Sequence, residues 1–93
     1  MSNSHSVVVL RALADDVRLG IVKNIAQNGG MVSSCDIVAS CESLTKLSQP
    51  TLSHHFSKLV DARVIRQHKN GTQNTYELNI ELLGDIGIDI HKI

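Results

Sequence analysis

Residues 48–59 of this chain read Ser48-Gln49-Pro50-Thr51-Leu52-Ser53-His54-His55-Phe56-Ser57-Lys58-Leu59. Ser48 is a good helix N-cap, and Pro50 suits the first helical turn because the N–H groups there have no intrahelical acceptor. The apolar residues recur at helical spacing, at Leu52, Phe56, Leu59 and Val60. The other face carries small polar, imidazole and ammonium groups. This pattern is typical of a helix that a core holds on one side and that enters a DNA groove with the other.

The basic residues of the chain are concentrated around this helix. Nine Lys and Arg balance nine Asp and Glu, so the net charge is zero. Between residues 46 and 75, however, a single acidic residue, Asp61, stands against Lys46, Lys58, Arg63, Arg66 and Lys69, a local charge of +4. The excess favours a nucleic-acid partner. A solvated cluster without a partner is the alternative.

Composition excludes other classes of protein. The chain has one Phe, one Tyr and no Trp, so it lacks an aromatic platform for stacking single-stranded bases. Two cysteines do not form a disulfide framework. The longest aliphatic run, Val7–Leu10, is far too short for a signal peptide or a membrane span. We therefore expect one domain over 1–93, in the cytoplasm and without membrane contact.

Helix caps and apolar spacing predict four helices in the first two-thirds of the chain. Residues 1–6 are polar and are expected to be disordered. The helices are predicted over 7–14, from a cap at Asp15 or Asp16 to Gly29-Gly30, from a cap at Ser33 or Ser34 to about Leu44, and from Ser48 to Val60. A strand is the alternative for the first, because Val7, Val8 and Val9 are β-branched.

A β-hairpin follows the fourth helix. Asn70-Gly71 predicts a two-residue type I′ turn, which places Lys69 opposite Thr72 and Ile65 opposite Tyr76. Leu78 then shares an apolar face with Ile65 and Tyr76, while Arg66 and His68 point the other way.

The sequence of the last segment favours a short helix that begins at about Ile80 and is capped by Asn79. A strand is the alternative, because Ile86, Ile88 and Ile90 also fit strand alternation. The whole order, α-α-α-α-β-β-α, is that of a winged helix. The predicted fold is mainly α with a small β-hairpin, and its third and fourth helices form a helix-turn-helix.

Four stretches resemble the ArsR/SmtB-type winged-helix repressors of bacteria and archaea. They are Leu13-Ala14-Asp15-Asp16-Val17-Arg18-Leu19, residues 47–59, Asp61-Ala62-Arg63-Val64-Ile65-Arg66 and Gly71-Thr72. The resemblance spans about Leu10 to Leu83. It implies a homodimer built from the first and last helices, which binds an inverted repeat in promoter DNA and is released by a metal ion or another signal. Arg63 stands where the family usually has Gly, which would cost about 1 kcal/mol if the left-handed conformation is kept.

The sequence identifies no sensor site. Metal-sensing members of the resembled family carry a Cys-x-Cys motif or paired Asp/His clusters on the last helix. Here Cys35 and Cys41 lie about 240° apart around a regular helix, so they cannot hold one ion from it. Asp89-Ile90-His91 matches only half of a last-helix cluster, and His54 and His55 diverge by about 100°. We expect no metal, no cofactor and no enzymatic site; buried thiols or a thiol switch across the dimer stay open.

Twelve residues of the fourth helix and the hairpin are predicted to contact DNA: Gln49, Pro50, Thr51, Ser53, His54, His55, Ser57, Lys58, Arg66, His68, Lys69 and Asn70. Gln49 would pair with adenine and the Thr51 methyl would touch a thymine methyl. Lys58, Arg66 and Lys69 would neutralise phosphates. His55 either braces the backbone or packs half-buried.

Surplus aliphatic surface at both ends, in 7–14 and 80–93, predicts the dimer interface at Val7, Val8, Leu10, Leu13, Leu82, Leu83, Ile86 and Ile90. The expected function is sequence-specific binding of double-stranded promoter DNA by a homodimeric repressor. The alternative is a winged-helix protein-interaction module that uses the same aliphatic ends. A third reading keeps the repressor and adds a thiol or metal input.

Overall fold

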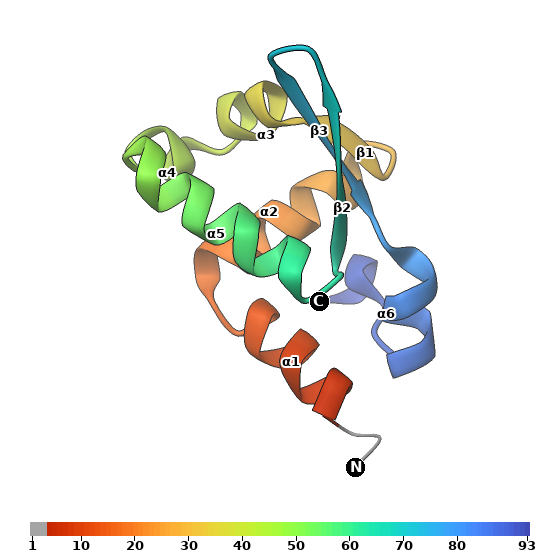
Figure 1. Ribbon diagram of the computed structural model, residues 1–93. Coiled ribbons are helices and arrows are strands. Elements are labelled where there is room, and N and C mark those ends of the chain that lie inside the picture. Colours follow the sequence, from red (N-terminus) through yellow and green to blue (C-terminus); the bar gives the residue numbers. More distant parts are fainter. Residues whose placement is uncertain (1–3) are drawn as a thin grey trace.

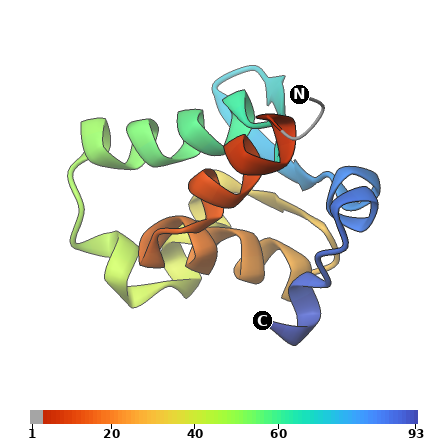
Figure 2. The same cartoon turned by 90° about the horizontal axis from the view of Figure 1, so that it is seen from below.

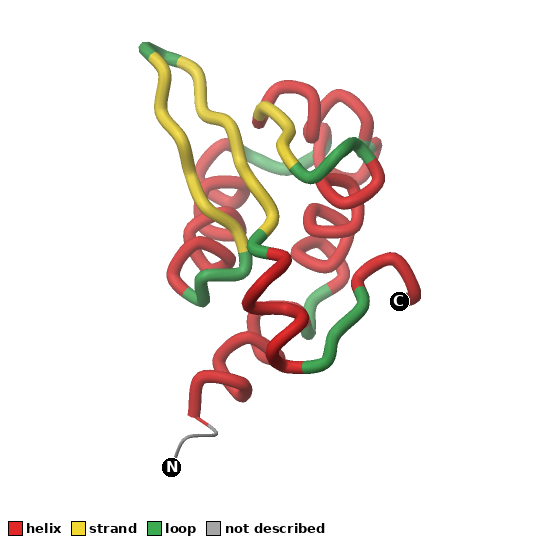
Figure 3. Tube along the Cα trace, turned by 90° about the vertical axis from the view of Figure 1, so that its right-hand side faces the viewer, coloured by secondary structure: helices red, strands yellow, loops and turns green. Residues whose placement is uncertain are grey.

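The computed structural model describes residues 4–93, which form a winged helix (Figure 1). Its elements, in chain order, are α1 Ser4–Leu13, α2 Asp16–Gln27, β1 Met31–Ser33, α3 Ser34–Ser40, α4 Glu42–Thr45, α5 Gln49–Asp61, β2 Ile65–Asn70, β3 Gln73–Leu78, α6 Ile80–Ile86 and the 3₁₀ helix η1 Ile90–Lys92. The predicted mainly α fold with a hairpin is confirmed. We call the hairpin of β2 and β3 the wing, and its tip and α1 lie at opposite ends of the molecule (Figures 1 and 3).

Side-chain caps fix where the helices begin. Asp15, Ser33, Ser48 and Asn79 each accept a hydrogen bond from a backbone N–H three residues on, at the starts of α2, α3, α5 and α6. Such a cap stabilises a helix by about 1 kcal/mol because it satisfies a donor that has no intrahelical partner. All four caps are among those that the sequence predicts.

One apolar core lies between the helices and the inner face of the sheet. Leu52, Phe56 and Leu59 of α5 are at most 6% exposed, as the predicted stripe requires. The Phe56 ring stacks on Tyr76 of β3, with centroids 4.5 Å apart and planes 8° from parallel. α5 is therefore packed directly against the wing.

The sheet contains a strand that the sequence did not indicate. Its order is β1-β3-β2, with both pairs antiparallel, and Val32 of β1 lies opposite Tyr76. β1 has only three residues, and its partner is more than forty residues away along the chain. Such a strand is stabilised by long-range pairing, which local periodicity does not reveal.

The predicted hairpin register is wrong by two residues. Asn70 pairs with Gln73 and Ile65 with Leu78, so Gly71 and Thr72 form the turn. Gly71 has a φ of 66° and Thr72 is not among the positive-φ residues, which is the pattern of a type II′ turn. Because a shift of two preserves alternation, Arg66 and His68 still point away from the face of Ile65, Tyr76 and Leu78.

Two helix boundaries also differ from prediction. The third predicted helix is split, because Cys41 is extended, with φ −118° and ψ 102°, between α3 and α4. Ser40 and Cys41 are weak helix formers, and the Ser40 hydroxyl donates back to the Asp36 carbonyl. At the N-terminus, residues 4–6 form the first turn of α1 rather than a disordered tail. Residues 1–3 of that prediction lie outside the described range.

Arg63 adopts the left-handed conformation between α5 and β2, with a φ of 64°. An L-residue there costs about 1–2 kcal/mol per residue. We expect Arg63→Gly to raise the free energy of unfolding by about 0.5–1 kcal/mol, since glycine relieves this strain but is more flexible when unfolded. Urea denaturation measures it. Arg63→Ala is the control: it removes the same charge and keeps the strain, so a gain as large as that of glycine would contradict the explanation.

Asp15 provides a stability that depends on pH. The hydrogen bond from the Arg18 backbone N–H, followed by the nearby positive charge of Arg18, holds the pKa of Asp15 below its usual value. A carboxylate with a depressed pKa stabilises the fold above the unfolded pKa, about 4, and this stabilisation is lost as the pH falls through the folded value. Asn caps helices about as well as Asp. Asp15→Asn should therefore lower the free energy of unfolding at pH 7, and this difference from the native protein should disappear in acid.

Urea denaturation of both proteins at a series of pH values checks this expectation. The control is Asp85→Asn, which alters an exposed carboxylate in α6. A difference between Asp15→Asn and the native protein that stays constant from pH 7 into acid would show that the charge of Asp15 contributes nothing.

Candidate nucleic-acid interface

The outward face of α5 consists of polar residues in two rows. Gln49, Ser53 and Ser57 follow one another at every fourth position and line a groove. A second row lies beside it and contains Pro50, Thr51, His54 and Lys58, all exposed. The Ser48 cap fixes the start of the helix, and the buried stripe fixes its rotation about its own axis. Apart from His55, every predicted contact on this helix is exposed.

The groove, about 720 Å³ in volume, lies between α3, α5 and the wing. Leu52, Phe56 and Tyr76 form its apolar floor, and the α5 row forms one wall. Across the floor, β2 contributes Gln67 and Lys69, and β3 contributes Asn74. A long polar helix face beside a projecting hairpin is the geometry by which winged helices hold duplex DNA.

Several groove residues were missed from the sequence. Gln67 and Asn74 share the inner sheet face with Lys69, and Ser34 and Cys35 reach the groove from α3. The alternation of β2 already placed Gln67 on the Lys69 side, so that signal was present. The sequence carries no such signal for the α3 residues, because their position at the groove depends on how the helices pack.

Burial raises the pKa of Tyr76, and its hydroxyl lies 3.5 Å from Gln67 Nε2.

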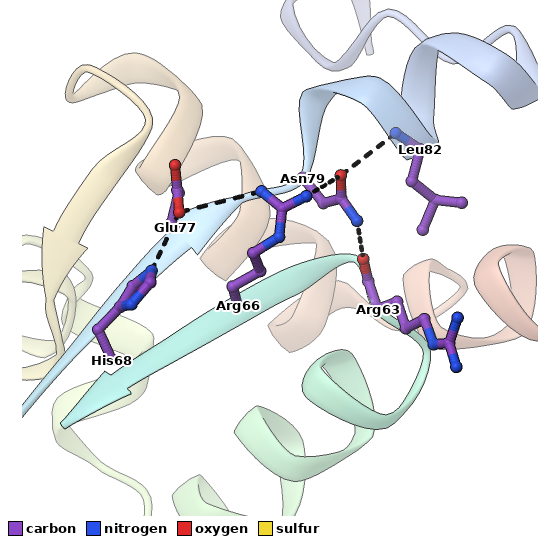
Figure 4. Close-up of polar contacts among 6 residues, drawn as sticks. All are labelled: Arg63, Arg66, His68, Glu77, Asn79 and Leu82. Atoms are coloured by element: carbon purple, nitrogen blue, oxygen red, sulfur yellow. Dashed lines mark hydrogen bonds and ion pairs between the residues drawn. The ribbon is translucent and has the colours of Figure 1, made fainter.

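Arg66 and His68 lie on the opposite, outer face of the sheet (Figure 4). Glu77 Oε1 lies 3.0 Å from His68 Nε2 and 3.9 Å from Arg66 Nη1. Arg66 Nη2 also donates to Asn79 Oδ1 at 3.2 Å. Surface ion pairs of this kind contribute about 0–1 kcal/mol. Strand alternation, rather than these pairs, places both side chains on the face away from the groove.

Asn79 joins the end of α5 to the last helix. Its Nδ2 donates to the Arg63 carbonyl at 2.8 Å, and its Oδ1 accepts from the Leu82 N–H at 3.3 Å (Figure 4). The strained residue after α5 is thus bonded to the cap of α6.

His55 packs inside the protomer, as one of its two predicted placements has it. Its side chain is 14% exposed, with Nδ1 3.3 Å from Arg18 Nη1 and 3.8 Å from Asp15 Oδ2. Its neighbour His54 is exposed. The two adjacent imidazoles therefore face different surroundings, and only His54 lies on the outward face of α5.

The residues predicted to form the dimer interface are only partly available to a second chain, because some of them are buried in the protomer's own core. Val7, Val8 and Leu10 are 42%, 45% and 51% exposed. Leu82 and Ile86 of α6 are half-buried. The other three predicted residues, Leu13, Leu83 and Ile90, are at most 7% exposed and belong to the protomer's own core. Apolar spacing identified them correctly as buried but could not say against which chain.

The two thiols lie at different ends of α3. Cys35 is exposed near the start of α3, and Cys41 is half-buried after its end. In the part of the chain that the structure describes, no three His, Cys, Asp or Glu side chains group so that they could hold a metal ion. A soft metal that needs several thiolates is not matched by these residues. No helix within residues 4–93 combines the length and apolar character needed to cross a membrane.

Comparison with known proteins agrees with this geometry. The family profile described as "Bacterial regulatory protein, arsR family" matches residues 15–67. The arsenical resistance operon repressor of Staphylococcus xylosus is 36% identical over 93 residues, which cover 100% of this chain and 84% of that protein. The transcriptional repressor SdpR of Bacillus subtilis (strain 168) is 32% identical over 77 residues, covering 83% and 79%.

A solved structure shares the fold. HlyU from Vibrio cholerae N16961 superposes with a TM-score of 0.71 at 27% identity, covering 91% of this chain and 87% of that one. The matched segment 15–67 contains α2, the helix-turn-helix and the first part of the wing. This chain belongs to the ArsR family of bacterial regulatory proteins and is a DNA-binding transcriptional regulator.

Proposed function

We propose that the chain acts in the cytoplasm as a homodimeric repressor that binds an inverted repeat in promoter DNA. The groove carries this proposal. Its α5 wall offers hydrogen-bonding side chains that read base edges, and its wing wall offers Lys69 to a phosphate. Relatives named as repressors support the direction of regulation.

The dimer rests on the exposed aliphatic residues of α1 and the half-buried ones of α6. These two helices lie at the end of the molecule away from the wing tip (Figures 1 and 3). Pairing them across a two-fold axis covers Val7, Val8 and Leu10 and leaves both wings outward. The two recognition helices, one α5 from each protomer, then enter successive major grooves about 34 Å apart. The rival function, a protein-interaction module without DNA binding, gains no support from the comparisons.

The bases and the phosphates are contacted by different residues. Gln49, Thr51, Ser53 and His54 face the bases, while Lys58 and Lys69 neutralise phosphates. Within residues 4–93, neither lysine forms an ion pair. Arg66 contributes less than its charge suggests, because strand alternation places it, together with His68, on the outer face of the sheet, away from the groove.

Lys69→Ala is expected to weaken binding to all duplex sequences alike and to reduce the slope of log K against log salt by about one unit. Fluorescence anisotropy between about 50 and 200 mM salt measures the slope. Lys92→Ala, which removes a cation paired with Asp89 in η1, is the control and should leave it unchanged. Arg66→Ala should change it less than Lys69→Ala. An unaltered slope for Lys69→Ala would rule out a phosphate contact from the wing.

Gln49→Ala is expected to relax base preference at one position of each half-site, by about 1–3 kcal/mol. Selection of bound sequences from random duplexes, done with native and variant proteins, measures the preference at every position. Gln27→Ala, at the exposed end of α2, is a matched glutamine control. The native selection also tests two-fold symmetry, and sedimentation tests the dimer. Sequences without symmetry, or a monomer, would refute the proposed homodimeric repressor.

A further inference from the structure

One guanidinium joins three helices on the side of α5 turned away from the groove. Arg18, the third residue of α2, donates from Nε to the Ala12 carbonyl of α1 at 2.7 Å. Its Nη1 lies 3.3 Å from Nδ1 of His55, in the middle of α5. Asp15 completes the cluster, accepting from the Arg18 N–H at 3.0 Å and lying 3.8 Å from His55.

Each contact holds a different helix. Ala12 is close to the end of α1, where carbonyls lack intrahelical donors and a cation is favourable. Only Ala14 and Asp15 separate α1 from α2, and α1 packs on both α2 and α5 (Figure 2). The direction in which α1 leaves the domain is therefore set at Arg18. The contact with His55 holds α5 in place relative to α1. The rotation of α5 about its own axis, and with it the direction of His54, is set by the buried stripe.

The two ends of this link have different partners. α1 presents Val7, Val8 and Leu10 to the second protomer of the proposed dimer, whereas α5 presents its polar rows to DNA. In such a dimer, the position of α5 relative to α1 determines how far apart the two recognition helices lie. A rigid relation lets both helices bind only if the half-sites have the matching separation.

We propose that Arg18 is a positioning residue for DNA recognition. By holding the end of α1 and the His55 ring at once, it sets the half-site spacing that the regulator accepts. This inference rests on the homodimeric operator binding proposed above. It predicts that breaking the link changes spacing selectivity and leaves the contacts to a single half-site intact.

Arg18→Lys keeps the charge but replaces the planar guanidinium, which contacts the two acceptors from two separate nitrogens, by a single flexible nitrogen. His55→Leu removes the ring acceptor, while His55→Asn retains a polar acceptor near the position of Nδ1. Affinities are measured for the selected inverted repeat, for the same repeat with its spacer changed by one or two base pairs, and for a single half-site. Urea denaturation and sedimentation monitor folding and the dimer.

The native dimer should bind the matching spacer about 100-fold more tightly than one half-site and lose most of that advantage on the altered spacers. Arg18→Lys and His55→Leu should bind the half-site as the native protein does, yet discriminate spacers several-fold less. His55→Asn should restore discrimination. If the folded, dimeric Arg18→Lys protein keeps the native ratio between spacers, the positioning role is wrong.

The two His55 variants keep the test valid if Arg18→Lys does not fold. Equal spacer discrimination by His55→Leu and His55→Asn also overturns the inference. A native protein that is monomeric, or that binds no inverted repeat, instead refutes the homodimeric operator binding and removes the basis of the inference with it. The two failures are thus distinguished by the behaviour of the native protein alone.

Discussion

The surface proposed to face DNA depends on the stacking of Phe56 on Tyr76. These are the only Phe and Tyr of a chain that has no Trp. One ring comes from α5 and the other from β3, so their contact determines how far the recognition helix stands from the wing. Such a pair contributes about 0.5–1.5 kcal/mol beyond the area that it buries. Because the rings are rigid and buried, the groove keeps a defined width.

Local chemistry made much of this fold predictable. Signals within a few residues predicted the caps at Asp15, Ser48 and Asn79 and the apolar stripe of α5. The strand alternation was also predicted correctly, although the hairpin register was wrong by two residues. Features that depend on a distant partner were not predictable. β1 exists because it pairs with β3, and the partners of Arg66 lie on β3 (Glu77) and at the start of α6 (Asn79).

The candidate site likewise contains parts that local sequence predicted and parts that depend on a distant partner. The exposed row of α5 followed from helical periodicity, but the partner of His55 comes from α2, thirty-seven residues earlier. Polar links of this long-range kind anchor α5 twice: Arg18 holds its middle, and Asn79 binds the carbonyl just after its end. The recognition helix is thus tied to both elements that carry the surplus aliphatic surface, α1 and α6.

The placement of Arg66 on the outer sheet face also bears on how the proposed repressor would search a genome. Non-specific DNA binding draws nearly all its free energy from counterion release, which grows with the number of phosphates neutralised. In the proposed complex, Arg66 lies on the outer sheet face, 3.9 Å from Glu77, so one cation fewer faces the duplex. Such a protein is retained less by the vast excess of non-operator sequence. A larger fraction of the protein would then be free to occupy the proposed operator.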